Sequence, residues 1–239
     1  MNYKEIYFEE IDSTNKYIKN HYLDLDNFTF ITTSYQTEGK GRNERTWKSN
    51  KGENLLFSLL IKDKNLTELG GYLSLVTSVS VAQVIEKYGI NNVSIKWPND
   101  INVNYKKVCG ILLEGQVPDY LAIGIGINVN QKVFDGEYHI SPTSLALERE
   151  KNIDLNDFKS DLHENLIYNI SNINYLKQAF INYFNSHNYL KNKDIYFTYN
   201  NQELTGNVLG VSDDFSLLID SNNQIMKVNS GEIHIKKAK

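Results

Sequence analysis

The sequence changes character near Lys191, and that change constrains the fold more than any other feature. Beyond it come short segments rich in apolar and β-branched residues, separated by turn-forming pairs such as Asn200-Asn201 and Asn222-Asn223. The expected strands of this part are residues 194–199, 203–211, 216–219 and 225–229. We therefore expect residues 192–239 to form a separate all-β module and residues 1–191 to form the main domain.

Residues 1–191 contain both strand-like and helix-like patterns. Apolar and β-branched runs predict strands at residues 4–8, 28–34, 54–61, 93–97, 101–103, 108–115 and 120–129. Helical spacing of apolar residues predicts helices at residues 12–22, 66–88, 154–170 and 173–189, the second of them ending at Gly89. Residues 36–53 are polar and predict a long loop, and such loops in compact domains are usually functional or mobile.

Composition excludes several classes of protein. The 239 residues are 41% apolar, which is enough for a hydrophobic core and excludes a disordered chain. Lys and Arg total 25 against 29 Asp and Glu, and the net charge of −4 argues against a general nucleic-acid binder. The single cysteine, Cys109, excludes an intramolecular disulfide and a cysteine-based zinc site. We find no signal peptide, no membrane span and no histidines at metal-ligand spacing, so we expect a cytoplasmic protein without a fixed metal site.

The loop at residues 36–53 combines glycines, cations and one aromatic ring. Gly39 and Gly41 let the backbone approach a ligand, and Trp47 offers a flat apolar face to a ring. The cations suit a phosphate or a carboxylate, and they are Lys40, Arg42, Arg45, Lys48 and Lys51. The spacing matches neither a Walker A loop nor a dinucleotide fingerprint, because Glu44 stands at the third glycine position. A solvated loop of mixed charge is the alternative interpretation.

Three later segments also suit a ligand. In Lys96-Trp97-Pro98-Asn99-Asp100 a proline stops a strand and leaves two polar side chains at the strand end, where ligands often bind. The segments at residues 107–114 and 124–130 carry glycines inside apolar strands, which indicates close approach of a ligand or of another backbone. An ordinary turn, an edge-strand lysine and tight sheet packing are the respective alternatives.

In this order and at this spacing, the segments resemble the biotin–protein ligases. The resemblance begins with Ser13-Thr14-Asn15 and Gln36, then follows the loop from Gly39 to Trp47 and the Lys-Trp-Pro-Asn-Asp run. It continues over residues 107–114 and 124–130, Thr143-Ser144-Leu145 and the closing Ser230-Gly231-Glu232-Ile233. It implies an α+β fold whose mixed sheet and flanking helices are similar to the catalytic domains of class II aminoacyl-tRNA synthetases. A small SH3-like β-barrel is implied for the C-terminal module.

The resemblance also implies a two-step reaction. The carboxylate of biotin attacks the α-phosphate of ATP to give biotinyl-5′-AMP and pyrophosphate, and a lysine of a biotin carboxyl carrier domain then takes the biotinyl group. Cations and Mg²⁺ would offset the repulsion between the two anions, and positioning would supply most of the catalysis. The expected ligands are biotin, ATP and Mg²⁺. The expected partner is the carrier domain, and a weak homodimer paired through sheet edges is implied as well.

Roles carry over from the family residue by residue. The residues that match the biotin site are Ser13, Thr14, Asn15, Gln36, Lys40, Gly41, Arg42, Lys107 and Gly110. Those that match the ATP and adenylate site are Gly39, Lys40, Arg45, Trp47, Asn99 and Asn128. Lys107, which matches the lysine at the biotin carboxylate and α-phosphate, is the first candidate for a catalytic residue, followed by Arg42 and Asp100. Asp100 would act through Mg²⁺ or by orienting Lys107 or the acceptor amine.

Two positions depart from the family pattern, since many relatives have Arg at the position of Lys40 and Gly at that of Glu44. Lys40 keeps the charge but loses the bidentate geometry of a guanidinium. Because the catalytic segments begin close to Met1 and the net charge is −4, we expect a ligase without the DNA-binding repressor role of some relatives. The alternatives are a lipoate–protein ligase, which shares the fold and the adenylate chemistry, and a non-catalytic sensor of biotin or a nucleotide.

Overall fold

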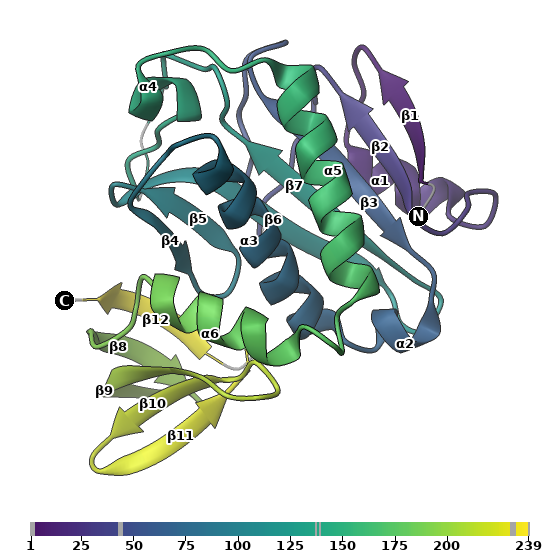
Figure 1. The fold of residues 1–239 in the computed structure, drawn as a ribbon. Coiled ribbons are helices and arrows are strands. Elements are labelled where there is room, and N and C mark those ends of the chain that lie inside the picture. The colour runs from purple at the N-terminus through teal and green to yellow at the C-terminus, as the bar shows by residue number, and fades with distance from the viewer. Residues whose placement is uncertain (1–2, 43–44, 137, 139, 230–232, 239) are drawn as a thin grey trace.

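The computed structural model describes residues 3–42, 45–136, 138, 140–229 and 233–238. Seven strands form a mixed sheet in the order β1-β2-β3-β7-β6-β5-β4 (Figure 1). β1 and β2 are parallel, and every other neighbouring pair in this sheet is antiparallel. The middle strands β3, β7 and β6 are hydrogen-bonded on both sides, which makes them a rigid floor for a site. The bounds are β1 Lys4–Phe8, β2 Thr29–Thr33, β3 Leu55–Ile61, β4 Val93–Lys96, β5 Asp100–Val103, β6 Lys106–Gln116 and β7 Tyr120–Ile127.

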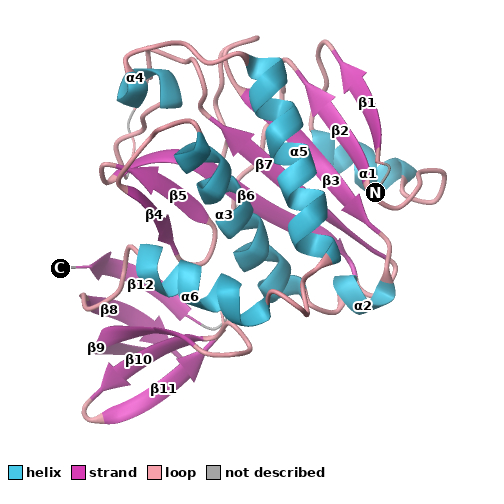
Figure 2. Cartoon of the chain, in the orientation of Figure 1, coloured by secondary structure: helices cyan, strands magenta, loops and turns pink. Residues whose placement is uncertain are grey.

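The helices cover the two faces of this sheet unequally. α3, Gly70–Lys87, and α5, Leu155–Ser171, lie across one face and bury the larger hydrophobic core there (Figures 1 and 2). α1, Thr14–His21, packs on the other face in a separate cluster of Ile18, Ile31, Leu60, Tyr120 and Ala122. Because successive residues of a strand point to opposite faces, Gly124 and Gly126 of β7 lie on the α1 face. That face has room beyond α1 for a ligand.

A second sheet of five antiparallel strands follows, in the order β11-β10-β9-β8-β12. It packs beside α6, Lys177–His187, and its buried residues join the larger core. One such contact is the stacking of the Tyr72 and Phe215 rings, whose centres are 3.8 Å apart. The fold is therefore α+β, with a mixed and an antiparallel sheet on one continuous core. The bounds are β8 Asp194–Tyr199, β9 Gln202–Val211, β10 Leu217–Ser221, β11 Gln224–Val228 and β12 Ile233–Ala238.

The prediction of one helix over residues 66–88 is wrong, because α2, Lys64–Thr67, and α3 are separate helices. Asp63 caps α2 by accepting hydrogen bonds from the N–H groups of Asn65 and Leu66, and α3 starts anew at Gly70. The apolar spacing continues across this break, so periodicity alone does not reveal it. α4, Leu145–Arg149, and β12 were not predicted either. No helix among the described residues is long and apolar enough to span a lipid bilayer.

His163 on α5 is completely buried under the sheet. Its ring stacks on Phe30, with centres 3.7 Å apart, and meets Phe57 edge-on at 4.8 Å. Neither ring nitrogen has a hydrogen-bond partner in the part of the chain that the structure describes. Burial lowers the pKa of His163 to about 3, against a smaller opposing effect of the Glu5 carboxylate. The histidine is therefore neutral in the folded protein at any mildly acidic pH.

We expect this histidine to make the folded state sensitive to acid. Below its ordinary pKa of about 6.5 an unfolded histidine takes up a proton that folded His163 does not. Stability should fall as the pH drops through this range, by about 1.4 kcal/mol per pH unit from this group. The free energy of unfolding, measured with urea, should therefore differ less between pH 7.5 and pH 5.5 for His163→Phe than for the wild type. Equal differences in the two proteins would contradict the prediction.

Candidate active site

A pocket of about 1180 Å³ opens on the face of the main sheet that carries α1. Its floor includes Gly110 on β6 and Gly124 and Gly126 on β7, and the β8–β9 turn with Asn200 and Asn201 borders it from the small sheet. The structure brings the predicted site residues together here, and Gly39 joins them through its contact with Trp47. Those that line the pocket are Ser13, Thr14, Asn15, Gln36, Lys40, Gly41, Arg42, Arg45, Trp47, Asn99, Asp100, Lys107, Gly110 and Asn128.

Uncharged polar side chains gather at the end of the pocket next to α1. Thr14 donates hydrogen bonds from its backbone N–H and its hydroxyl to Oε1 of Gln36, at 2.8 and 3.1 Å. The Ser58 hydroxyl lies 2.6 Å from both the Thr14 hydroxyl and Oδ1 of Asn15. The Asn15 amide donates to Oε2 of Glu114 at 2.7 Å. Because these groups hold one another in place, this end presents a preorganised set of donors and acceptors to a neutral polar ligand.

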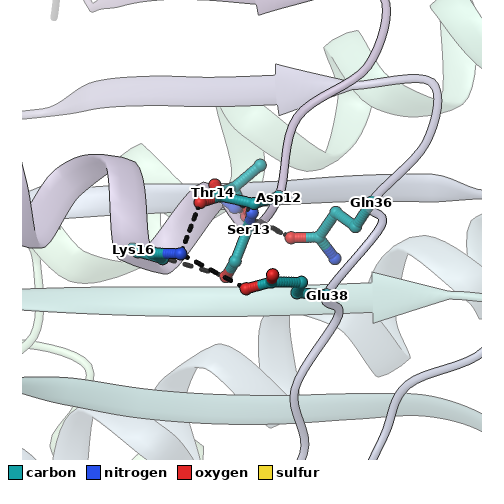
Figure 3. Close-up of polar contacts among 6 residues, drawn as sticks. All are labelled: Asp12, Ser13, Thr14, Lys16, Gln36 and Glu38. Atoms are coloured by element: carbon teal, nitrogen blue, oxygen red, sulfur yellow. Dashed lines mark hydrogen bonds and ion pairs between the residues drawn. The ribbon is translucent and has the colours of Figure 1, made fainter.

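Three charged side chains, Asp12, Lys16 and Glu38, lie beside this polar end (Figure 3). Nζ of Lys16 lies 2.7 Å from Asp12 and 3.2 Å from Glu38. Ser13 caps α1 by accepting a hydrogen bond from the backbone N–H of Lys16. The backbone N–H of Glu38 donates to the Asp12 carbonyl at 2.9 Å. These contacts tie the start of α1 to the start of the 36–53 loop, although an exposed ion pair adds little stability.

The glycines of the floor make room for side chains of the site itself. A Cβ atom at Gly124 would lie 2.6 Å from Oδ1 of Asn15. One at Gly126 would lie 2.6 Å from Cε2 of Trp47, and one at Gly110 would lie 3.0 Å from its Cζ3. Close approach is therefore present at these strand glycines, but the approaching groups are side chains, such as the Trp47 indole that rests on two of them, and not the predicted ligand or backbone.

Backbone hydrogen bonds fold the loop back on itself. The N–H of Trp47 donates to the Gly39 carbonyl at 2.9 Å, and that of Gly41 donates to the Arg45 carbonyl at 2.7 Å. A Cβ atom at Gly39 would lie 2.7 Å from the Trp47 carbonyl oxygen. The side chains of Lys40 and Arg45 are exposed at the opening of the pocket. The predicted departure at Glu44 and the closing Ser230-Gly231-Glu232 lie outside the described residues.

Two cations are held inside the pocket by defined partners. Nζ of Lys107 lies 2.6 Å from Oδ1 of Asp100, and their side chains are 28% and 20% exposed. The Arg42 guanidinium donates from Nη1 to Oδ1 of Asn99 at 3.3 Å. Burial lowers the pKa of Arg42, while the Asp100 carboxylate acts in the opposite direction. Partly buried cations in a pocket favour an anionic ligand, because an anion restores the interactions that burial removes.

Asn128 lies at the other end of the floor from Asn15, two residues beyond Gly126 along the chain. Its Nδ2 donates to the Thr143 carbonyl at 3.1 Å. Its Oδ1 is buried, as is Nε1 of Trp47, and neither has a hydrogen-bond partner within the described ranges. Buried polar atoms without partners are uncommon in folded proteins. Trp47 Nε1 lies against the floor at Gly126, so the Asn128 oxygen is the atom at this end that suits a donor on a ligand.

Four residues contribute to the site although they were not predicted to belong to it: Ser58, Lys96, Asn200 and Asn201. Ser58 lies in the otherwise apolar strand β3, where a polar residue was the available signal. Lys96 lines the pocket, and burial lowers the pKa of its ammonium group. Asn200 and Asn201 form a turn far along the chain, and only the packing of the small sheet brings them to the site.

Comparison with known proteins decides the family. A model of the biotin/lipoate A/B protein ligase family matches residues 7–130, just over half of the chain. The chain belongs to this family. It is 30% identical to the bifunctional ligase/repressor BirA of Bacillus subtilis, over 96% of this chain and 73% of that protein. It is 31% identical to the biotin–[acetyl-CoA-carboxylase] ligase of Mycobacterium tuberculosis, over 45% of this chain and 41% of that protein.

Solved structures agree with this membership of the biotin/lipoate A/B protein ligase family. The biotin protein ligase of Aquifex aeolicus in complex with biotin and ATP superposes with a TM-score of 0.88 at 28% identity, over 98% of this chain and 99% of that chain. The ligase of Leishmania major in complex with biotin shares the fold, with a TM-score of 0.69 at 19% identity, over 95% of this chain and 98% of that chain. The predicted resemblance to biotin–protein ligases is confirmed.

Proposed function

We propose that this protein activates biotin with ATP as biotinyl-5′-AMP and transfers the biotinyl group to a lysine of a biotin carboxyl carrier domain. One observation carries the proposal. One pocket joins a neutral polar end at Thr14 and Gln36 to the cations Lys107 and Arg42, and then to the amide oxygen of Asn128, which has no hydrogen-bond partner among the described residues. This order matches a biotin ring system, a carboxylate joined to a phosphate, and a nucleobase.

The polar end suits the ureido ring of biotin, which carries one carbonyl acceptor and two N–H donors. Ser13, Thr14, Asn15 and Gln36 offer hydroxyl and amide groups of both kinds in a largely buried setting. Gly110 lets the Trp47 ring and the Lys107 ammonium lie close to the floor, where a side chain would crowd both. Lys40, Gly41 and Arg42 lie on the loop above and would cover the biotin tail and the phosphate.

The cations would carry the first step. Two anions must meet when the biotin carboxylate attacks the α-phosphate, and fixed positive charge lowers that barrier. Lys107 would contact both groups, Arg42 would hold the phosphate from the loop, and Asp100 would orient the Lys107 ammonium through their 2.6 Å contact. No protein nucleophile is needed, because the biotin carboxylate is itself the nucleophile and the enzyme mainly positions it.

The remaining residues would bind the nucleotide. Trp47 offers the face of its indole to the adenine ring, and Asn99 and Asn128 offer amide groups. Arg45 and Lys40 stand at the opening, where the phosphates released as pyrophosphate would leave. Gly39 would act indirectly, by letting the Trp47 backbone approach within the loop.

The pocket fits Mg²⁺ that arrives with the nucleotide. Within the described residues there is no group of three or more His, Cys, Asp or Glu side chains that could hold a metal ion. Mg²⁺ typically keeps several waters and binds through one or two carboxylates and the phosphates of its substrate, so Asp100 would supply the protein oxygen. The ion would neutralise phosphate charge.

We assign the two parts of the chain different contributions. Residues 1–191 would form the catalytic domain, related to class II aminoacyl-tRNA synthetases, and residues 192–239 an SH3-like barrel that completes one wall of the pocket. The net charge of −4 supports a ligase without operator-specific DNA binding. The homodimer and the cytoplasmic location stay predictions.

Transfer to a carrier domain tests the complete reaction. The protein is incubated with biotin, ATP, Mg²⁺ and a purified biotin carboxyl carrier domain, and the carrier is weighed by mass spectrometry. We expect one biotinyl group per carrier, and none on a carrier whose acceptor lysine is replaced by arginine. A wild-type carrier that stays unmodified would contradict the transfer step.

A further inference from the structure

Glu148 lies outside the pocket but is joined to it through Thr143. Its side chain, on the short helix α4, is only 9% exposed. Oε1 accepts a hydrogen bond from the Thr143 hydroxyl at 2.6 Å, and Oε2 accepts one from Nδ2 of Asn104 at 2.6 Å. Nζ of Lys106 is 3.7 Å from Oε1. A carboxylate held by two such hydrogen bonds fixes the groups that donate to it.

Thr143 connects Glu148 to the Asn128 end of the pocket through hydrogen bonds of its backbone. The residue is buried, its backbone N–H donates to the Lys107 carbonyl at 2.9 Å, and its own carbonyl accepts from Nδ2 of Asn128 at 3.1 Å. Lys107 is also held by strand pairing within the main sheet. Asn128 follows the last residue of β7, and its amide takes its orientation from the Thr143 carbonyl.

We propose that Glu148 is a positioning residue for nucleotide binding, because through Thr143 it fixes the amide of Asn128. With Nδ2 committed to the Thr143 carbonyl, Oδ1 of Asn128 is the atom left to accept a hydrogen bond from the base. If Thr143 moves, the amide can rotate and present its NH₂ group instead. A donor on the base cannot form a hydrogen bond with that group, because both are donors. The inference rests on the proposed function, since it takes the Asn128 end to be the nucleotide end.

Steady-state exchange of pyrophosphate into ATP tests the proposal, with ATP and biotin varied separately. Glu148→Ala should raise the KM for ATP about tenfold, the loss of roughly one well-placed hydrogen bond, and leave the KM for biotin unchanged. Glu148→Gln keeps an acceptor for the Thr143 hydroxyl and should restore most of the ATP affinity. Arg149→Ala, at the next and exposed position of α4, is the matched control and should behave as wild type.

Thr143→Val deletes the same contact from the other side. It should raise the KM for ATP to a similar extent, and the double variant with Glu148→Ala should be no worse than either single variant, because both remove one interaction. If Glu148→Ala does not fold, Thr143→Val alone still tests whether the contact between Thr143 and Glu148 affects the KM for ATP. An unchanged KM for ATP in folded variants, or equal rises for ATP and biotin, would overturn the proposal.

Calorimetric titration of ATP into each protein separates this proposal from the proposed function. A wild type that binds ATP without exchange would contradict the adenylation reaction. The positioning role would still be supported if Glu148→Ala weakened ATP binding and Arg149→Ala did not. It would be overturned if the two variants bound ATP equally well.

Discussion

Replacing Lys107 by alanine should lower biotin-dependent exchange of pyrophosphate into ATP by about 10²–10³-fold, the typical cost of removing a fixed group that stabilises charge in a transition state. The Lys107 ammonium lies on the pocket floor 2.6 Å from Asp100 and close to Gly110, where the carboxylate and the α-phosphate would meet. The loss should appear mainly in kcat, because the two anions repel each other most strongly as the bond forms. Exchange of labelled pyrophosphate measures it directly.

Removing Lys107 also leaves Asp100 without its cation, so the folded state of the variant is checked by thermal unfolding. Lys19→Ala, at an exposed position of α1, is the matched control and should keep wild-type exchange. A Lys107→Ala protein that folds and keeps the wild-type kcat would contradict the catalytic role of Lys107.

Gly126→Ala should lower exchange by about 10²-fold, the scale expected when a reacting group is displaced by about 1 Å. The added Cβ would lie 2.6 Å from Cε2 and 2.9 Å from Nε1 of Trp47, both in a rigid ring that cannot bend away. The indole must then rise from the floor, together with the loop that carries it. The intrinsic fluorescence of Trp47 should change as well, because its contact with the sheet is lost.

Gly71→Ala provides the matched control for a glycine-to-alanine change. Gly71 lies in α3, where an added Cβ would meet nothing within 4 Å, and alanine is the better helix former. This control should keep wild-type activity and at least wild-type stability. If Gly126→Ala were equally active, the position of Trp47 on the glycine floor would have no catalytic importance.

Strands of both sheets could be predicted well, because the alternation and burial of their side chains depend on neighbouring residues in the chain. β1 and β8 have their predicted bounds, and β3 and β7 differ from prediction by one or two residues at an end. The break between α2 and α3 could not be predicted from apolar spacing, since it depends on capping by Asp63 and on the contact of Thr67 with the Pro118 carbonyl. α4 escaped prediction because only five residues form it.

The candidate site divides in the same way. Residues in short, ordered motifs, such as Asn99, Asp100 and Lys107, could be proposed from the sequence through the family resemblance. Ser58 could not, because its partner Thr14 lies far away along the chain, and Glu148 could not, because it reaches the site only through Thr143 and the amide of Asn128. A serine in a strand and a glutamate in a short helix carry no functional signal by themselves. Only the register of the sheet and the packing of α4 bring these two side chains to the site.

Adenylation of biotin is the central claim, and exchange of labelled pyrophosphate into ATP tests it most directly. The wild-type protein is assayed with Mg²⁺ and either biotin or lipoate as the only carboxylate substrate. We expect exchange with biotin and only background exchange with lipoate. Exchange with lipoate alone, or with neither substrate in a protein that still binds biotin or ATP, would contradict the proposed function.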